Sequence, residues 1–252
     1  MGKNFSNATT GKPIELGGSL GRKEATSLGL ICAAREAVRL TGKPFEKTRV
    51  VIQGCGNVGS GAAKLFYEGG CTVVAVCDIT GAIYNHGGID IPALLAHVEE
   101  TGFIEGFSGG QPLSKDEVLT IDCDLLMPAA LENQITAANA AAIKASIVVE
   151  AANGPTTAEG GEILKEKGVL LVPDILANSG GVTVSYFEWV QNNEGFYWDL
   201  NTINGRLKTM MAQTFQAVHR FAGEKCGGDL RQAAYCYAIG RIARAMQFRG
   251  SL

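Results

Sequence analysis

The sequence lacks the features of membrane, secreted and nucleic-acid-binding proteins. Nowhere do eighteen apolar residues run together, and residues 1–13 contain no apolar segment of the kind found in secretory signals. Charged residues make up only 19% of the chain, the net charge is −3, and no basic block occurs. We therefore expect a cytoplasmic protein that binds neither membranes nor nucleic acid.

The sequence also lacks clustered metal ligands. Its three histidines show no ligand spacing, and its seven cysteines are odd in number, scattered and without a C-x-x-C pair. This pattern indicates neither a metal site nor a disulfide framework, and it predicts buried free thiols in a reducing compartment. Cys55 lies within a glycine-rich turn, where we expect an inert small side chain and not a reactive thiol.

Glycine is abundant, with 33 residues, and three glycines fall in the most informative stretch of the chain, residues 49–78. There an apolar strand leads into Gly54, Gly56 and Gly59, a helix follows, and a second apolar strand ends on Asp78. Such glycines permit a tight turn, close approach of a pyrophosphate, and close packing of helix on strand. An acid at this distance hydrogen-bonds the adenosine ribose. The stretch predicts a dinucleotide site; a purely structural βαβ unit, with Asp78 as a cap, is the alternative.

Strands and helices alternate over most of the chain. We expect strands over 49–54, 72–78, 125–127, 147–150 and 169–172, and helices over 19–41, 61–66, 91–100, 136–144 and 158–167. Residues 103–116 are rich in glycine and polar residues and predict a surface excursion outside the core. Short connections between alternating elements require a parallel sheet covered on both faces, so the predicted fold is α/β, a Rossmann-type doubly wound parallel sheet.

The termini differ from this pattern. Residues 1–18 are polar and without periodicity, and we take residues 1–10 as a lead-in tail and 11–198 as the dinucleotide-binding domain. After Asn178 the expected strands cease, and helices are predicted over 179–192, 200–224 and 230–249. Residues 199–252 therefore form a helical C-terminal extension that packs on the sheet or on a partner domain.

Several further motifs occur in order along the chain. They are GGSLGRKEAT (17–26), the glycine turn with Asn57, PAALE (128–132), EAANGPTT (150–157), Pro173-Asp174 and NSGGVTVSYFEW (178–189). Together they resemble the coenzyme-binding domain of hexameric glutamate dehydrogenase, in the glutamate/leucine/phenylalanine/valine dehydrogenase family, over about residues 11–252. That family converts L-glutamate, water and NAD(P) to 2-oxoglutarate, ammonia and NAD(P)H, in a cleft between two domains.

The resemblance implies a set of coenzyme contacts. Asn57 and the backbone N–H groups of Gly56, Val58 and Gly59 are expected at the pyrophosphate, and Arg22 and Thr26 near the phosphates and nicotinamide. Ser27-Leu28 replace the Gly-Arg that the family often has after this threonine, which changes the contacts of that turn.

Two asparagines and a short loop complete the expected coenzyme site. Asn153 and Asn178 match family asparagines at the nicotinamide and its ribose, and Ala129 and Ala130 match the segment that runs along the coenzyme. An acid at position 78, with no lysine or arginine in the same turn, favours NAD, although NADP stays open.

The resemblance also implies a substrate class. Ser185 matches the serine that binds the side-chain carboxylate of glutamate, and Val182 matches the residue packed on the substrate's methylene groups. Leucine- and phenylalanine-type dehydrogenases, the nearest alternative, carry an apolar residue in place of this serine.

The family's catalytic lysine and aspartate belong to the N-terminal domain, for which no matching segment exists here, so we expect no catalytic residue in this chain. The chain is then predicted to bind dinucleotide without turnover, and to self-associate through its C-terminal helices. A stand-alone NAD-binding or interaction module is the alternative from another functional class.

Overall fold

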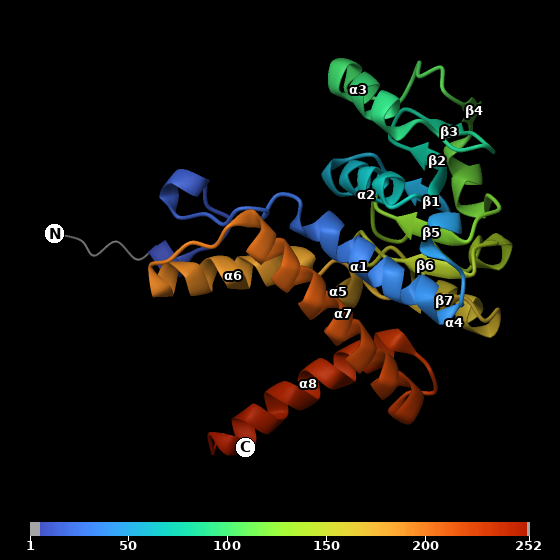
Figure 1. Ribbon diagram of the computed structural model, residues 1–252. Helices are drawn as coiled ribbons and strands as arrows, with labels where there is room; N and C mark the ends of the chain where they lie inside the picture. Colours follow the sequence, from blue (N-terminus) through green and yellow to red (C-terminus); the bar gives the residue numbers. More distant parts are fainter. Residues whose placement is uncertain (1–5, 251–252) are drawn as a thin grey trace.

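The computed structural model describes residues 6–250, which form a seven-stranded sheet covered by helices (Figure 1). The predicted units 1–10 and 199–252 thus include residues 1–5 and 251–252, which lie outside the described residues. The strands are β1 (Arg49–Gln53), β2 (Thr72–Cys77), β3 (Ala82–Tyr84), β4 (Gln111–Leu113), β5 (Leu125–Pro128), β6 (Ile147–Val149) and β7 (Leu170–Val172). Their order is β4-β3-β2-β1-β5-β6-β7, and β2, β1, β5, β6 and β7 run parallel.

Helices cover both faces of this sheet. They are α1 (Ala25–Leu40), α2 (Asn57–Glu68), α3 (Ile91–Thr101), α4 (Ala158–Glu166), α5 (Asp174–Ala177), α6 (Gly180–Glu194), α7 (Leu200–Lys225) and α8 (Leu230–Phe248). Consecutive strand residues point to opposite faces, so Val50 and Ile52 join one apolar core while Val51 joins the other. The first core also holds Leu30 of α1, and the second holds Leu164 of α4. The predicted doubly wound α/β fold with C-terminal helices is confirmed.

Three sequence predictions about single elements are wrong. Residues 103–116 were expected to be a surface excursion, but they contain β4, which pairs antiparallel with β3, and Ile104 is buried. Both β3 and β4 are only three residues long, so neither shows a hydrophobic period in the sequence. The helix expected over 136–144 is only a 3₁₀ turn at Ala140–Ala142. There the Asn139 side chain bonds the backbone at Thr136 and Gln134, which competes with helical hydrogen bonds.

The third correction concerns the start of the first helix. It begins at Ala25 and not at residue 19, because Gly21 has φ +70 and residues 20–24 form turns. This places Arg22 in the turn before α1, and Thr26 in the helix's first turn.

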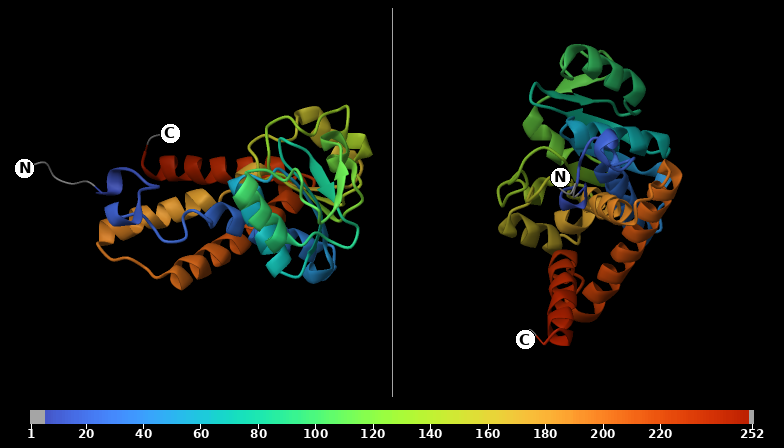
Figure 2. Two further views of the ribbon diagram at one scale, coloured as in Figure 1. Left: turned by 90° about the horizontal axis from the view of Figure 1, so that it is seen from above. Right: turned by 90° about the vertical axis from the view of Figure 1, so that its left-hand side faces the viewer.

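The segment before that turn packs along α6, and the two project together from the sheet (Figure 2). The carboxylate of Glu188, fully buried on α6, accepts hydrogen bonds from the backbone N–H groups of Gly11 and Lys12 and from Lys12 Nζ at 2.5 Å. Asn192 Nδ2 donates to the Gly17 carbonyl at 2.9 Å. An aperiodic segment is therefore ordered by side chains of a distant helix.

The last helix, α8, leaves the domain as a separate arm (Figures 1 and 2). Its first turns are anchored, because Leu230, Ala233 and Ala234 are buried. Beyond them its large apolar side chains are exposed: Tyr235, Ile239, Ile242, Met246 and Phe248. Across the part of the chain that the structure describes, no helix combines the length and apolar character needed to cross a membrane.

Candidate functional site

The glycine turn joins β1 to α2 at the carboxyl edge of the sheet. Gly54 has φ +109, and a Cβ on Gly59 would lie 1.9 Å from the Gly54 carbonyl oxygen, so both positions require glycine. At Gly56, by contrast, an added Cβ would meet no atom within 4 Å. Gly56 is the N-cap of α2 and no side chain caps this helix, so its first N–H groups face open space beside a positive dipole end. This arrangement suits an anion such as a pyrophosphate.

Asp78 follows β2 and lines a cavity of about 740 Å³ together with Gly54 and Gly56. Its Oδ1 accepts hydrogen bonds from Thr80 N at 2.7 Å, from the Thr80 hydroxyl at 2.5 Å and from Gly81 N at 3.3 Å. Its Oδ2 accepts from the N–H of buried Ile104 at 2.8 Å. The carboxylate is thus held in place by its own turn and by the segment after α3, which the sequence pattern did not connect to it.

A second cavity, of about 680 Å³, lies on the other side of the turn. It is lined by predicted coenzyme and substrate residues, namely Arg22, Thr26, Val58, Ala129, Ala130, Asn153, Asn178 and Val182. Residues 129–131 line both cavities, so the two meet beside the glycine turn. Of the other predicted residues, Asn57 is exposed at the start of α2 and Gly59 is buried in the turn.

Two contacts link the predicted residues within this second site. Asn178 Nδ2 donates to Asn153 Oδ1 at 2.8 Å and more weakly to the Ala151 carbonyl at 3.3 Å. Arg22 Nε donates to the Ser185 hydroxyl at 2.9 Å. Ser185 is therefore placed beside the cavity by a residue 163 positions earlier in the chain.

Close helix packing makes the second contact possible. A Cβ on Gly180 would lie 2.2 Å from the Ala25 carbonyl oxygen, and one on Gly181 would lie 2.6 Å from the Thr26 hydroxyl. The two glycines at the start of α6 thus let it approach α1 closely enough for Arg22 to reach Ser185.

Several lining residues of the first cavity were missed by sequence reasoning. Lys115, whose Nζ donates to the Ile79 carbonyl at 2.9 Å, is the only cation among the described residues that line it. Phe103 lines it too, from the segment expected to be a surface excursion. Gln53 is 7% exposed, and its Oε1 has no hydrogen-bond partner within residues 6–250. No local pattern marks Lys115 and Phe103, since they reach the cavity through tertiary contacts, whereas Gln53 lies at the end of β1, directly before Gly54.

Cys55 lies beside the glycine turn, and its thiol is not activated. Burial raises the pKa of the Cys55 thiol, with Asp78 adding to the effect, to about 11, so this thiol is protonated at neutral pH. Within residues 6–250 no three His, Cys, Asp or Glu side chains group closely enough to hold a metal ion.

A sequence model described as "Glutamate/Leucine/Phenylalanine/Valine dehydrogenase" matches residues 17–250 of this chain. The chain belongs to this family. It corresponds to the C-terminal, NAD(P)-binding domain of glutamate dehydrogenases. The resemblance expected from the motifs is thereby confirmed.

Curated relatives with high similarity are bacterial glutamate dehydrogenases. The catabolic NAD-specific glutamate dehydrogenase RocG of Bacillus subtilis (strain 168) is 48% identical over 96% of this chain and 56% of its own length. The NAD-specific glutamate dehydrogenase of Staphylococcus aureus (strain COL) is 47% identical over 98% of this chain and 59% of its own length. The chain thus spans between a half and two thirds of the length of these relatives.

Solved structures share the fold of this dehydrogenase domain. The hetero-hexameric glutamate dehydrogenase of Thermus thermophilus, in a leucine-bound form, matches with a TM-score of 0.88 and 36% identity, over 95% of this chain and 56% of that one. The glutamate dehydrogenase of Peptoniphilus asaccharolyticus matches with a TM-score of 0.84 and 41% identity, over 96% and 57%.

Proposed function

We propose that this domain binds NAD across the carboxyl edge of its sheet and serves as the coenzyme half of a glutamate dehydrogenase. The pyrophosphate lies at Gly56 and the open start of α2, the adenosine occupies the cavity of Asp78, and the nicotinamide riboside occupies the cavity of Asn153 and Asn178. One observation carries the proposal: two cavities, of about 740 and 680 Å³, meet beside the glycine turn. Ligands bind at this edge in doubly wound sheets.

Asp78 and Lys115 decide the coenzyme preference in this proposal. The fixed carboxylate of Asp78 accepts hydrogen bonds from the ribose hydroxyls and repels a 2′-phosphate. Lys115 lines the same cavity, and its ammonium group partly offsets that repulsion. NAD-specific relatives at 46–48% identity support NAD as the preferred coenzyme, with weaker binding of NADP.

For the substrate side, Arg22 and Ser185 form a donor pair next to the nicotinamide cavity. We assign the Ser185 hydroxyl, which Arg22 holds in place, to the side-chain carboxylate of L-glutamate, because a hydroxyl can donate to an anionic oxygen and would not favour the apolar side chain of leucine. Val182, 67% exposed, offers the apolar contact for the methylene groups. NAD, when bound, supplies the hydride acceptor for oxidation of the amine carbon.

The residues of this chain position the reactants and leave proton transfer to other groups. The family's catalytic lysine and aspartate match no residue here, so the chain by itself is expected to bind coenzyme without measurable glutamate oxidation. Adding the separately produced N-terminal domain of a relative such as RocG should restore turnover. The alternative of a stand-alone NAD-binding or interaction module predicts that turnover is not restored.

The decisive measurement is a titration of the chain with NADH and with NADPH, followed by nucleotide fluorescence. We expect saturable binding of both, with NADH at least about tenfold tighter, a difference of about 1.4 kcal/mol. Absence of saturable NADH binding would overturn the proposed function, and tighter binding of NADPH would overturn the assignment of Asp78.

The exposed apolar face of α8 gives the isolated chain a second expected property. Ile239 and Ile242 are 61% and 62% exposed, and with Tyr235 and Met246 they form a continuous apolar stripe. We expect concentration-dependent self-association, which sedimentation velocity of the wild type and of an Ile239→Lys, Ile242→Glu variant would detect. A monomeric wild type at high concentration contradicts this expectation.

A further inference from the structure

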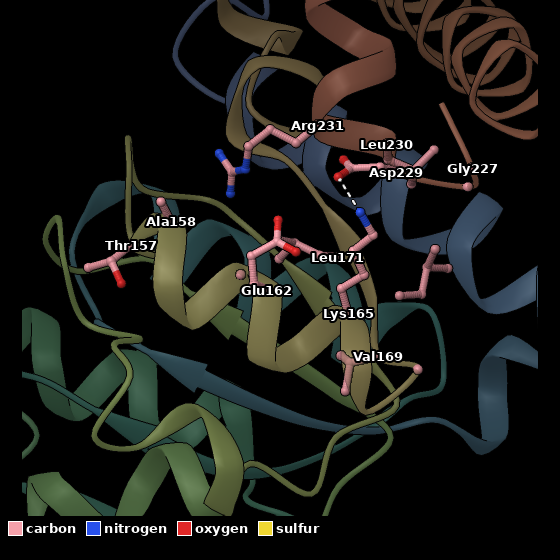
Figure 3. A pocket seen from close by; sticks show the side chains of 14 residues that line it. Thr157, Ala158, Glu162, Lys165, Val169, Leu171, Gly227, Asp229, Leu230 and Arg231 are labelled. Carbon is pink, nitrogen blue, oxygen red and sulfur yellow. Dashed lines mark hydrogen bonds and ion pairs between the residues drawn. The ribbon is translucent and has the colours of Figure 1, made fainter. Parts of the chain in front are cut away.

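A cavity of about 420 Å³ separates α4 from the turn between α7 and α8, away from the coenzyme cavities. Figure 3 shows Glu162 and Lys165 on the α4 side and Asp229 and Arg231 on the α8 side. Lys165 bridges it by an ion pair with Asp229 at 3.3 Å. Arg231 instead extends past the cavity, and its guanidinium contacts carboxylates that follow two strands of the sheet.

The two carboxylates belong to Glu150, directly after β6, and Asp174, at the start of α5. Arg231 Nη2 lies 2.6 Å from Glu150 Oε1, and Nη1 lies 3.6 Å from Asp174 Oδ1. The Glu150 side chain is fully buried. Burial raises the pKa of Glu150 and the Arg231 charge opposes this rise, so the guanidinium favours the ionised carboxylate.

These same carboxylates hold the loop that carries Asn153. Glu150 Oε2 accepts from the Asp174 N–H at 2.9 Å, and Asp174 Oδ2 accepts from the Gly154 N–H at 2.8 Å. Asn153, next to Gly154, lines the nicotinamide cavity and is bonded to Asn178. A continuous set of contacts thus runs from the first turn of α8, through two carboxylates, to the nicotinamide side of the site.

We propose that Arg231 is a positioning residue for the nicotinamide half of the coenzyme site. By neutralising Glu150 and Asp174 together, it fixes the Gly154 N–H and so the direction in which Asn153 faces the cavity. The inference rests on the proposed coenzyme function. It gives α8 an indirect role in the coenzyme site, because Arg231 acts through two carboxylates and does not itself contact the coenzyme. No other cation is bonded to either carboxylate within residues 6–250.

The position of Arg231 depends on the anchored start of α8. Asp229 caps this helix by accepting from Gln232 N at 2.9 Å, and Leu230, Ala233 and Ala234 are buried beside it. The rest of α8 is an exposed arm. The anchored first turn thus fixes Arg231 relative to the strand ends, independently of the exposed arm.

The test compares a ligand that contains nicotinamide with one that lacks it. In Arg231→Met, we expect the dissociation constant for NADH to rise about tenfold, the effect of losing one well-placed hydrogen bond. The constant for ADP, which shares the adenosine and pyrophosphate but has no nicotinamide riboside, should stay within about twofold. A general loss of structure would weaken both ligands equally, and that outcome would overturn the inference.

A matched control and a second variant keep the test specific. Lys165→Met removes the neighbouring ion pair across the same cavity and should change neither constant. Glu150→Gln combined with Arg231→Met avoids an unpaired buried charge, while the amide oxygen introduced at position 150 can still accept from Asp174 N. In this folded double variant Asp174 still lacks its cation, so NADH should bind more weakly than to the wild type; binding equal to the wild type would overturn the inference.

Amide hydrogen exchange tests the same contacts without any ligand. Arg231→Met should speed exchange of the Gly154 amide at least about tenfold, whereas Lys165→Met should not. Unchanged exchange at Gly154 would overturn the inference. If the wild type binds no dinucleotide while Gly154 responds as expected, the failure belongs to the proposed function and not to this set of contacts.

Discussion

Gly56→Ala separates folding from coenzyme binding at the glycine turn. At this position φ is −75, and the added Cβ meets no atom within 4 Å, so the folded chain tolerates a methyl group. The expected loss of stability is about 1 kcal/mol, the cost of alanine at an N-cap, or a fall in Tm of about 2–4 °C. The same methyl group would stand between a pyrophosphate and the open N–H groups of α2.

The expected loss of binding is much larger than the loss of stability. A charge-assisted hydrogen bond contributes about 1.5–3 kcal/mol, so displacing the pyrophosphate from one such donor weakens NADH binding about 10- to 150-fold. Gly59→Ala should instead lower stability strongly: its Cβ falls 1.9 Å from the Gly54 carbonyl oxygen, so the turn must open, at about 3 kcal/mol or 6–12 °C in Tm, and coenzyme binding at the opened turn should weaken as well.

Calorimetry for Tm and NADH fluorescence titration for affinity measure the two effects separately. Gly161→Ala, at a helical position with equal space around its Cβ, is the matched control: it should leave the affinity for NADH unchanged and raise Tm by about 2–4 °C, because alanine is about 1 kcal/mol better than glycine inside a helix. If Gly56→Ala folds normally and binds NADH within about twofold of the wild type, the pyrophosphate does not lie against this turn.

Three further predictions concern charge and thiol chemistry. Lys12→Met should lower the free energy of unfolding by about 3 kcal/mol at pH 7, because Glu188 is left buried without its cation. Burial raises the pKa of Glu188, but hydrogen bonds from Lys12 and Gly11 outweigh this and lower it below 4.5. The stability that Glu188 contributes is therefore present above pH 4.5 and lost as the pH falls through its folded pKa. Urea unfolding should accordingly show the free energies of unfolding of the wild type and of Lys12→Met becoming equal in acid. Lys115→Met should weaken NADPH binding about fivefold with little effect on NADH, and an equal effect on both would contradict the role given to Lys115 in that cavity. Iodoacetamide at pH 7.5 should modify exposed Cys236 first, half-buried Cys55, with a pKa of about 11, more slowly, and buried Cys71 and Cys123, with pKa values of about 12, last, as intact mass and peptide mapping would show.

Some site residues could be predicted to lie together before the fold was known. Gly54, Asn153 and Asn178 each follow a predicted strand or the turn after one, and carboxyl ends of parallel strands share one edge. The structure places Asn153 and Asn178 in one cavity and Gly54 in the adjoining one, as that rule requires. Local pattern and topology were sufficient here because the sheet itself converts sequence order into proximity.

Other residues could not be predicted in this way. Lys115 and Phe103 come from a segment whose short strand β4 has no period of its own, and they reach the cavity because that segment folds back over the sheet edge. Arg22 meets Ser185 across 163 positions, and Arg231 meets Glu150 across 81. These pairs depend on how helices pack, and helix packing is decided by side-chain volumes over the whole core.

The amino-acid sequence by itself determined the class of fold, the glycine turn and the family, because these depend on local periodicity and on motifs a few residues long. The tertiary structure alone decided that Asp78 is held by Ile104, that Arg22 contacts Ser185, and that Arg231 of α8 contacts the carboxylates that hold the loop of Asn153. Such contacts join elements that are distant in the chain, so their geometry exists only once the apolar core has fixed where each element lies.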